Sequence, residues 1–124
     1  MTTPQVPGTV LLAHGSRDAR WRDPIEAVAA RMRADDPAVH VLCAYMELAA
    51  PDLPTAAAAL IADGATAVHV VPLFLGMGKH AREDLPLQLD ALRQRWPDVA
   101  FSLAPIVGES PELVALLARI AIKS

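Results

Sequence analysis

Short apolar runs alternate with longer amphipathic segments along the whole chain. The run at 9–15 (TVLLAHG) precedes a segment at 18–35 whose apolar residues recur at helical spacing, and this order repeats three more times. Continuous apolar runs are typical of buried strands in a parallel sheet, because both faces of such a sheet are covered. The alternation therefore predicts an α/β fold, with a four-stranded parallel sheet flanked by helices and the βα unit repeated four times.

The ends of these segments carry residues that begin or end helices. Ser110 and Pro111 are suited to the cap and first position of the last helix, and Gly64 to the end of the second. Pro86 fits the third helix only within its first turn, because proline lacks the N–H that later turns use. The expected strands are 9–15, 38–46, 66–75 and 99–107, and the expected helices lie within 18–35, 47–64, 79–96 and 110–124.

The last helix has apolar residues on nearly all sides. This pattern fits either a contact between two copies of the chain or a deeply packed helix. The residues are Leu113, Val114, Leu116, Leu117 and Ile120.

Length and composition fit one globular domain over residues 1–124, with 53% hydrophobic and 20% charged residues. The net charge of −3 argues against nucleic acid as the main partner. Cys43 is the single cysteine and lies in an apolar run, so we expect a buried small hydrophobe and no internal disulfide. The start, MTTPQVPG, lacks a signal region, and the longest apolar stretch is too short to cross a bilayer. We expect a cytoplasmic protein without a membrane partner.

Each expected strand is followed by polar or glycine residues. Right-handed crossovers place the carboxyl ends of all parallel strands at one edge, where ligands of open α/β sheets bind. We therefore expect His14, Glu47 and His80 to converge there, whereas His40 and His69 fall early in their strands and are expected to be structural. The residues following the four strands are, in turn, His14, Gly15, Ser16 and Arg17; Met46 and Glu47; Gly76, Met77, Gly78, Lys79 and His80; and Gly108, Glu109 and Ser110.

Two histidines and one carboxylate can hold a divalent transition metal while leaving coordination positions open. Arg17, Lys79 and Arg82 add cations beside them, which favours an anionic substrate such as a polycarboxylate or a phosphate. Simpler interpretations remain open at this point: a histidine that only ends a strand, or a surface glutamate at a helix start. Signatures of nucleotide binding and of the hydrolase nucleophile elbow fit poorly, because required residues are missing around Lys79 and Ser16.

Three separated motifs, each following an expected strand, resemble those of one family. LLAHGSRD, YMELAAPDLP and VVPLFLGMGKHAREDLP are similar to the short-form class II tetrapyrrole chelatases, the CbiX-like sirohydrochlorin cobaltochelatases, with sirohydrochlorin ferrochelatases as close relatives. The likeness extends from Val10 to about Ile120. It implies a chelatase-like fold comparable with one half of the longer chelatases, and a homodimer of two short chains.

The resemblance also implies roles for particular residues. His14 and His80 would bind the metal, His14 would also accept a proton, and Glu47 would contact substrate or metal. Catalysis would thus involve His14, His80 and Glu47. The residues expected to contact the substrate are Ser16, Arg17, Glu47, Leu75, Gly76, Met77, Gly78, Lys79 and His80.

The expected reaction is insertion of Co²⁺ into sirohydrochlorin, a polycarboxylate tetrapyrrole, during cobalamin synthesis. The metal is then a substrate, with Fe²⁺ or Ni²⁺ as alternatives, and no tightly bound cofactor is expected. Two other hypotheses remain: a ferrochelatase of sirohaem synthesis, and a carrier of tetrapyrrole or metal without catalysis.

Overall fold

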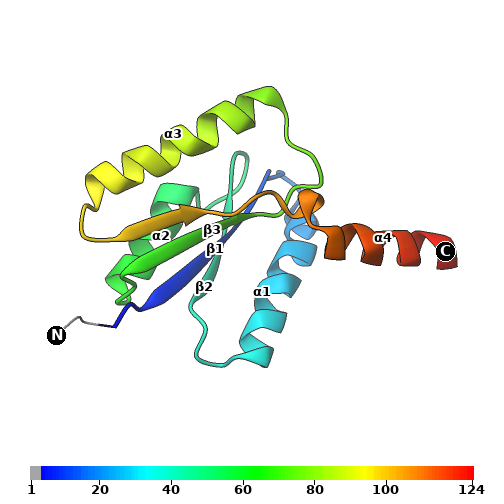
Figure 1. Cartoon of the computed structure of the whole chain (residues 1–124), viewed down its shortest axis with the longest axis horizontal. Helices are drawn as coiled ribbons and strands as arrows, with labels where there is room; N and C mark the ends of the chain where they lie inside the picture. Colours follow the sequence, from blue (N-terminus) through cyan, green and yellow to red (C-terminus); the bar gives the residue numbers. More distant parts are fainter. Residues whose placement is uncertain (1–3) are drawn as a thin grey trace.

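Four parallel strands form a single sheet in the order β2-β1-β3-β4 in the computed structural model, which describes residues 4–124 (Figure 1). The predicted α/β fold of four βα units is confirmed. Residues 1–3, part of the segment in which no export signal was expected, lie outside the described residues. The elements are β1 (Pro7–Ala13), η1 (Ala19–Arg22), α1 (Asp23–Asp35), β2 (Val41–Tyr45), α2 (Leu53–Ala62), β3 (Ala67–Pro72), α3 (Lys79–Arg95), β4 (Ala100–Leu103), η2 (Val107–Glu109) and α4 (Pro111–Lys123), where η marks a 3₁₀ turn.

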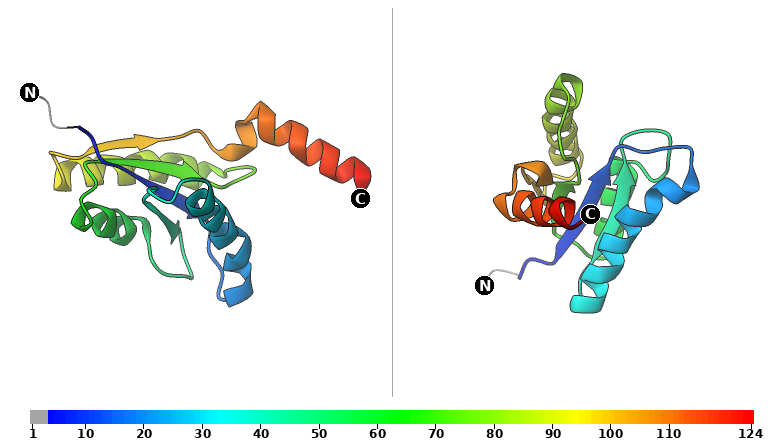
Figure 2. Two further views of the ribbon diagram at one scale, coloured as in Figure 1. Left: turned by 90° about the horizontal axis from the view of Figure 1, so that it is seen from below. Right: turned by 90° about the vertical axis from the view of Figure 1, so that its right-hand side faces the viewer.

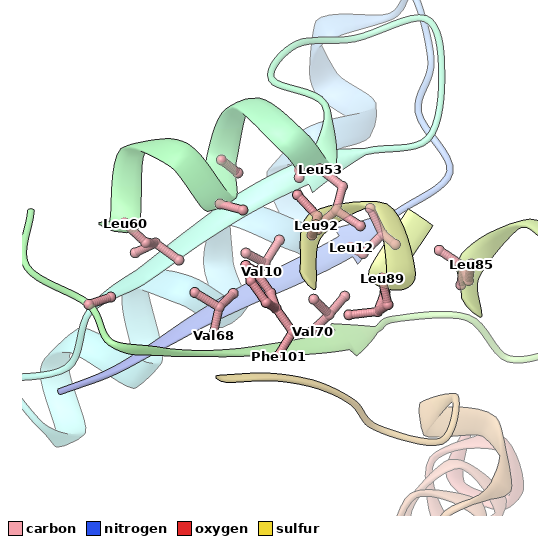
Figure 3. Close-up of a cluster of buried hydrophobic side chains, with 14 of the residues drawn as sticks. Val10, Leu12, Leu53, Leu60, Val68, Val70, Leu85, Leu89, Leu92 and Phe101 are labelled. Carbon is pink, nitrogen blue, oxygen red and sulfur yellow. The ribbon is translucent and has the colours of Figure 1, made fainter. Parts of the chain in front are cut away.

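The main hydrophobic core lies between the sheet and two helices, α2 and α3 (Figure 3). Alternate residues of each strand point into it, as the two-residue period of a strand requires. Val10 and Val70 from the sheet and Leu85 from α3 are completely buried. Because β1 and β3 are the central strands, this core fixes the strand ends from which the candidate site is built.

A smaller core lies on the opposite face, between α1 and the strands β1 and β2. Cys43 is 5% exposed there and is free, which confirms the predicted buried cysteine. Burial raises the pKa of its thiol to about 11, with the nearby Glu26 carboxylate adding to the effect. Cys43 is therefore neutral at physiological pH and unsuited to nucleophilic chemistry.

The fourth helix departs from the expected arrangement. α4 is a regular helix, capped by the Ser110 hydroxyl and beginning at Pro111, as predicted. None of its residues is buried, and it runs away from the sheet instead of flanking it (Figures 1 and 2). The interpretation of this segment as a deeply packed helix is wrong. Among residues 4–124, no helix is long and apolar enough to span a membrane.

The Pro86 expectation is also wrong, since this proline lies within α3 rather than in its first turn. Its ring is on the exposed side of the helix, where water can hydrate the carbonyl that loses its partner. Three strands are shorter than expected. β2 begins after His40, β3 begins after Thr66, and β4 ends at Leu103.

Candidate functional site at the carboxyl edge of the sheet

The loops after β1 and β2 are joined by backbone hydrogen bonds at the carboxyl edge of the sheet. The Met46 amide donates to the Ala13 carbonyl and the Glu47 amide to the His14 carbonyl, each with an N···O distance of 2.9 Å. The ladder between the two strands thus continues past their ends. Two of the three expected site residues, His14 and Glu47, are brought together through their backbones.

Gly15 makes this close approach possible. Its φ of +118° lies in the left-handed region, where side-chain-bearing residues are strained. A Cβ atom at this position would overlap the Glu47 carbonyl oxygen and lie 2.8 Å from the carbonyl carbon. The glycine that follows His14 in the first motif is therefore required by the contact between the two loops.

The His14 side chain is exposed but held in a defined orientation. Its imidazole stacks on the Phe74 ring, with 4.2 Å between centroids and 19° between the planes. Phe74 is 2% exposed and belongs to the main core. A buried aromatic ring thus positions a solvent-facing imidazole. Sequence reasoning missed Phe74, although an aromatic residue immediately before the glycine-rich loop was the available signal.

His80 lies in the first turn of α3 and is exposed. The loop before it contains Leu75, which is 67% exposed, and Gly76 and Gly78, around whose Cβ positions nothing lies within 4 Å. Met77 is half-buried and packs against the main core. This segment therefore combines one anchored side chain with open space, into which a flat ligand could approach.

A second close approach connects this loop to the end of β4. The Gly108 amide donates to the Phe74 carbonyl at 3.0 Å, and a Cβ on Gly108 would overlap the Leu75 carbonyl oxygen. The role of Gly108 as a contact to the β3 loop could not be inferred from its spacing. This contact places η2 beside the loop that follows β3.

The expected cations are available for an anionic ligand. Arg17, Lys79 and Arg82 are exposed, and within residues 4–124 none of them forms an ion pair. Ser16 is half-buried, and its hydroxyl accepts a hydrogen bond from the Asp18 amide at 3.1 Å. Ser16 therefore shapes the turn that presents Arg17.

The start of α2 is fixed by Asp52, whose side chain accepts a hydrogen bond from the Thr55 amide at 2.9 Å. Hydrogen bonding with Thr55 holds the pKa of this carboxyl below its usual value. Because the Tyr45 amide also donates to the Pro51 carbonyl, the loop that carries Glu47 is held at both ends.

The described part of the chain contains no group of three or more His, Cys, Asp or Glu side chains placed to hold a metal ion. His14 and His80 follow β1 and β3, which are neighbours in the sheet. His40 lies before β2, at the opposite edge, 3.5 Å from the Asp63 carboxylate. His69 lies within β3, where Nδ1 is 2.6 Å from the Ser102 hydroxyl. The last two histidines therefore belong to other parts of the fold, as expected.

A family model described as CbiX matches residues 8–123. Among curated relatives, a sirohydrochlorin ferrochelatase from Priestia megaterium is 30% identical over 107 residues, covering 86% of this chain and 40% of the relative. A sirohydrochlorin cobaltochelatase from Sulfurisphaera tokodaii is 27% identical over 110 residues, covering 89% and 87%. The chain thus spans about 40% of the ferrochelatase but most of the cobaltochelatase.

Solved structures show the same fold. A putative cobalamin biosynthesis CbiX protein from Marinobacter aquaeolei superposes with a TM-score of 0.82 at 37% identity, covering 96% of this chain and 93% of that one. The sirohydrochlorin chelatase SirB of Bacillus subtilis subspecies spizizenii, in complex with cobalt, gives 0.77 at 26% identity and covers 91% and 48%. The chain therefore matches a short protein over more than nine-tenths of its length and about half of a longer one.

Proposed function

The chain belongs to the CbiX family, and from this membership and the site at its sheet edge we propose that it is a sirohydrochlorin chelatase that inserts Co²⁺ during cobalamin synthesis. Relatives named sirohydrochlorin cobaltochelatase and sirohydrochlorin ferrochelatase support the substrate. The observation that carries the proposal is the imidazole of His14. It is exposed, oriented by Phe74 and joined through its backbone to the Glu47 loop.

Insertion of a divalent metal into a free-base tetrapyrrole releases two protons, since the M²⁺ ion replaces two pyrrole N–H hydrogens. His14 and His80 bind the ion through neutral imidazole nitrogens and leave other positions for the ring nitrogens. Glu47, or His14 once its nitrogen has released the ion, accepts the departing protons one at a time and passes them to water. Because the ion is a substrate, no resident cofactor is proposed.

Two ligands from one chain bind an ion less tightly than a closed structural site with four. In this proposal the lack of a third ligand side chain in the described residues is useful, because the metal must leave. Ligand exchange then transfers the ion from imidazole to the four nitrogens of the macrocycle.

The substrate is held by charge and by open space. Arg17, Lys79 and Arg82 bind carboxylates at the edge of the macrocycle, since none of them forms an ion pair in the part of the chain described. The ring itself lies over the loop of Leu75, Gly76, Met77 and Gly78, where both glycines are open. The Ser16 hydroxyl, which accepts a hydrogen bond from the Asp18 amide, stabilises the turn that carries Arg17.

The active form in this proposal is a homodimer. The chain spans 48% of the SirB chain, so a second copy supplies what the other half provides in the longer protein. Fe²⁺ is the alternative metal, because one relative is named a ferrochelatase, and Ni²⁺ accepts the same ligands.

The test is anaerobic metallation of sirohydrochlorin followed by absorbance, with Co²⁺, Fe²⁺ and Ni²⁺ in parallel. We expect multiple turnovers, fastest with Co²⁺. The variants His14→Ala and His80→Ala should each lose at least about 100-fold in rate, as expected for ligands that also handle protons. His40→Ala is the matched control, because this histidine lies at the opposite edge of the sheet.

Three results would contradict the proposal, the last of them only in its metal and pathway. Pigment or metal binding without acceleration over the protein-free reaction would identify a carrier. Equal losses in His14→Ala and His40→Ala would show that the carboxyl edge is not the reaction site. A fastest rate with Fe²⁺ would instead reassign the enzyme to sirohaem synthesis.

A further inference from the structure

The loop between β2 and α2 contains a strained residue directly after Glu47. Among the residues that the structure describes, Leu48 is the one residue other than glycine whose φ, +61°, lies in the left-handed region. A Cβ atom crowds the following carbonyl oxygen in this conformation, so glycine and asparagine adopt it at lower cost than leucine. Such positions cluster at active sites and ligand contacts, where the surrounding structure holds them in place. The position of Leu48 therefore calls for a functional explanation.

The loop holds Leu48 in this conformation from both sides. Met46 packs against the main core, and Ala49 packs against the smaller core on the other face of the sheet. The hydrogen bond from the Glu47 amide to the His14 carbonyl fixes the segment to the end of β1. Leu48 thus lies between two anchored residues, so its backbone cannot relax without moving the loop.

The side chain of Leu48 contributes little to the packing of the chain. Leu48 is 55% exposed and belongs to neither of the two clusters of packed hydrophobic residues. Glycine at this position would remove the strain and would also expose less apolar surface to water. Folding alone therefore favours glycine, whereas a leucine fits a contact with a molecule outside the chain.

A second exposed leucine lies on the other side of His14. Leu75 follows Phe74 in the loop after β3 and is 67% exposed. Because β1 lies between β2 and β3, the loops that carry the two leucines flank His14 at the same edge of the sheet (Figure 1). The imidazole proposed to bind the metal thus has an exposed apolar side chain in the loop on each side of it.

We infer that Leu48 is a specificity-determining residue that contacts the apolar face of the tetrapyrrole. This inference rests on the proposed function and adds to it a residue with no charge and no metal-binding atom. The cations near His14 bind the carboxylates at the periphery of the macrocycle, but they do not bind its flat face. Leu48 supplies an apolar contact on the β2 side and Leu75 on the β3 side, so that the ring nitrogens are presented to the ion at His14.

The first test is a titration with metal-free sirohydrochlorin, which requires no catalysis. The pigment is added anaerobically to the full chain and its variants, and its absorbance gives the Kd. Leu48→Gln keeps the backbone strain and the length of the side chain but makes its end polar, whereas Leu48→Met keeps it apolar. We expect the Kd to rise about 5–10-fold for Leu48→Gln, as for the loss of a half-buried leucine contact, and to change little for Leu48→Met.

Leu87→Gln is the matched control for this titration. Leu87 is 65% exposed and lies in the third turn of α3, about 12 Å along the helix from its first residue. The same substitution there removes an exposed leucine of equal size. We expect it to leave the Kd for sirohydrochlorin unchanged.

Salt distinguishes an apolar contact from a charged one. The titrations are repeated at about 0.05 M and about 1 M salt, since ionic interactions between exposed groups are screened at the higher concentration. We expect the factor lost in Leu48→Gln to be the same at both concentrations. The factor lost in Arg17→Ala should shrink at high salt, because this residue contacts a carboxylate.

The variant Leu48→Gly tests whether folding uses the side chain. We expect its urea midpoint to be equal to or higher than that of the wild type, because relief of strain offsets the greater flexibility of glycine in the unfolded chain. Its Kd for the pigment should nevertheless rise as in Leu48→Gln. A residue needed only for the fold would show the opposite pattern, a lower midpoint and an unchanged Kd.

Other outcomes would overturn the inference. A wild-type chain that binds and metallates the pigment while Leu48→Gln binds it equally well would refute the role of Leu48 and leave the chelatase proposal intact. Weaker self-association of Leu48→Gln in sedimentation equilibrium, with an unchanged Kd for the pigment, would assign the side chain to a contact between copies. A wild-type chain that does not bind sirohydrochlorin would refute the proposed function, and the inference with it.

Discussion

The variant Gly15→Ala tests whether the contact between the β1 and β2 loops holds the site together. A left-handed backbone at a residue with a side chain costs about 1–3 kcal/mol. The new Cβ also overlaps the Glu47 carbonyl oxygen, so the loops must separate and lose the hydrogen bond from the Glu47 amide to His14, which costs about 1 kcal/mol. We expect a loss of about 2–4 kcal/mol in the free energy of unfolding.

Urea denaturation measures this loss directly, and thermal melting should show a decrease of roughly 4 °C per kcal/mol for a chain of this length. The matched control is Gly76→Ala, because nothing lies within 4 Å of its Cβ position. The control should change stability by no more than about 0.5 kcal/mol. Equal stability of Gly15→Ala and Gly76→Ala would refute the argument that the two loops depend on this glycine. The metallation rate of Gly15→Ala should also fall about 100-fold, because His14 is displaced.

Three further changes follow from the structure. Burial raises the pKa of the Cys43 thiol from 9.0 to about 11, so the contribution of the neutral thiol to stability is present below pH 9 and is lost as the pH rises to 11. The urea midpoint of the wild-type chain should therefore fall between pH 9 and pH 11. The fall should be smaller in Cys43→Ala, which lacks the thiol. Asp52→Ala should cost about 1 kcal/mol, measured by urea denaturation, whereas Asp52→Asn should keep most of the cap. Phe74→Leu should lower the metallation rate about 10-fold by releasing the His14 ring, and Phe101→Leu, a core control, should not. Equal falls of the urea midpoint in the wild type and Cys43→Ala would contradict the first expectation, and equal stabilities of Asp52→Ala and Asp52→Asn the second. Equal metallation rates of Phe74→Leu and Phe101→Leu would contradict the third.

The sheet and the meeting of the loops at its carboxyl edge could be predicted because they depend on local patterns. Apolar runs of strand length and helical periodicity are visible in any window of the sequence, and parallel topology then fixes which strand ends meet. His14 and Glu47 are joined at the edge for that reason. The stacking of His14 on Phe74 could not be predicted, since it depends on how the loop after β3 bends over the core.

Two of the differences from expectation, at Pro86 and α4, concern positions where exposure decides the structure. Pro86 continues α3 because its ring is on the solvent side, and spacing alone does not show which side that is. The apolar residues of α4 fitted either a contact between two copies or a deeply packed helix, because a buried helix and an exposed one can have the same sequence pattern. Only the absence of buried residues on α4 distinguishes the two.

Backbone hydrogen bonds connect the site loops in the same order as the strands. The Glu47 amide joins the β2 loop to β1 at the His14 carbonyl, the Leu73 amide joins β3 to the Leu12 carbonyl at 2.7 Å, and the Gly108 amide joins the β4 end to the β3 loop. The hydrogen-bond ladder of the sheet is thus extended into the site loops, which holds the backbone at His14. Gly76 and Gly78 lie outside these bonds and have open space around them, so the segment between them is where the site can adapt to a large planar substrate.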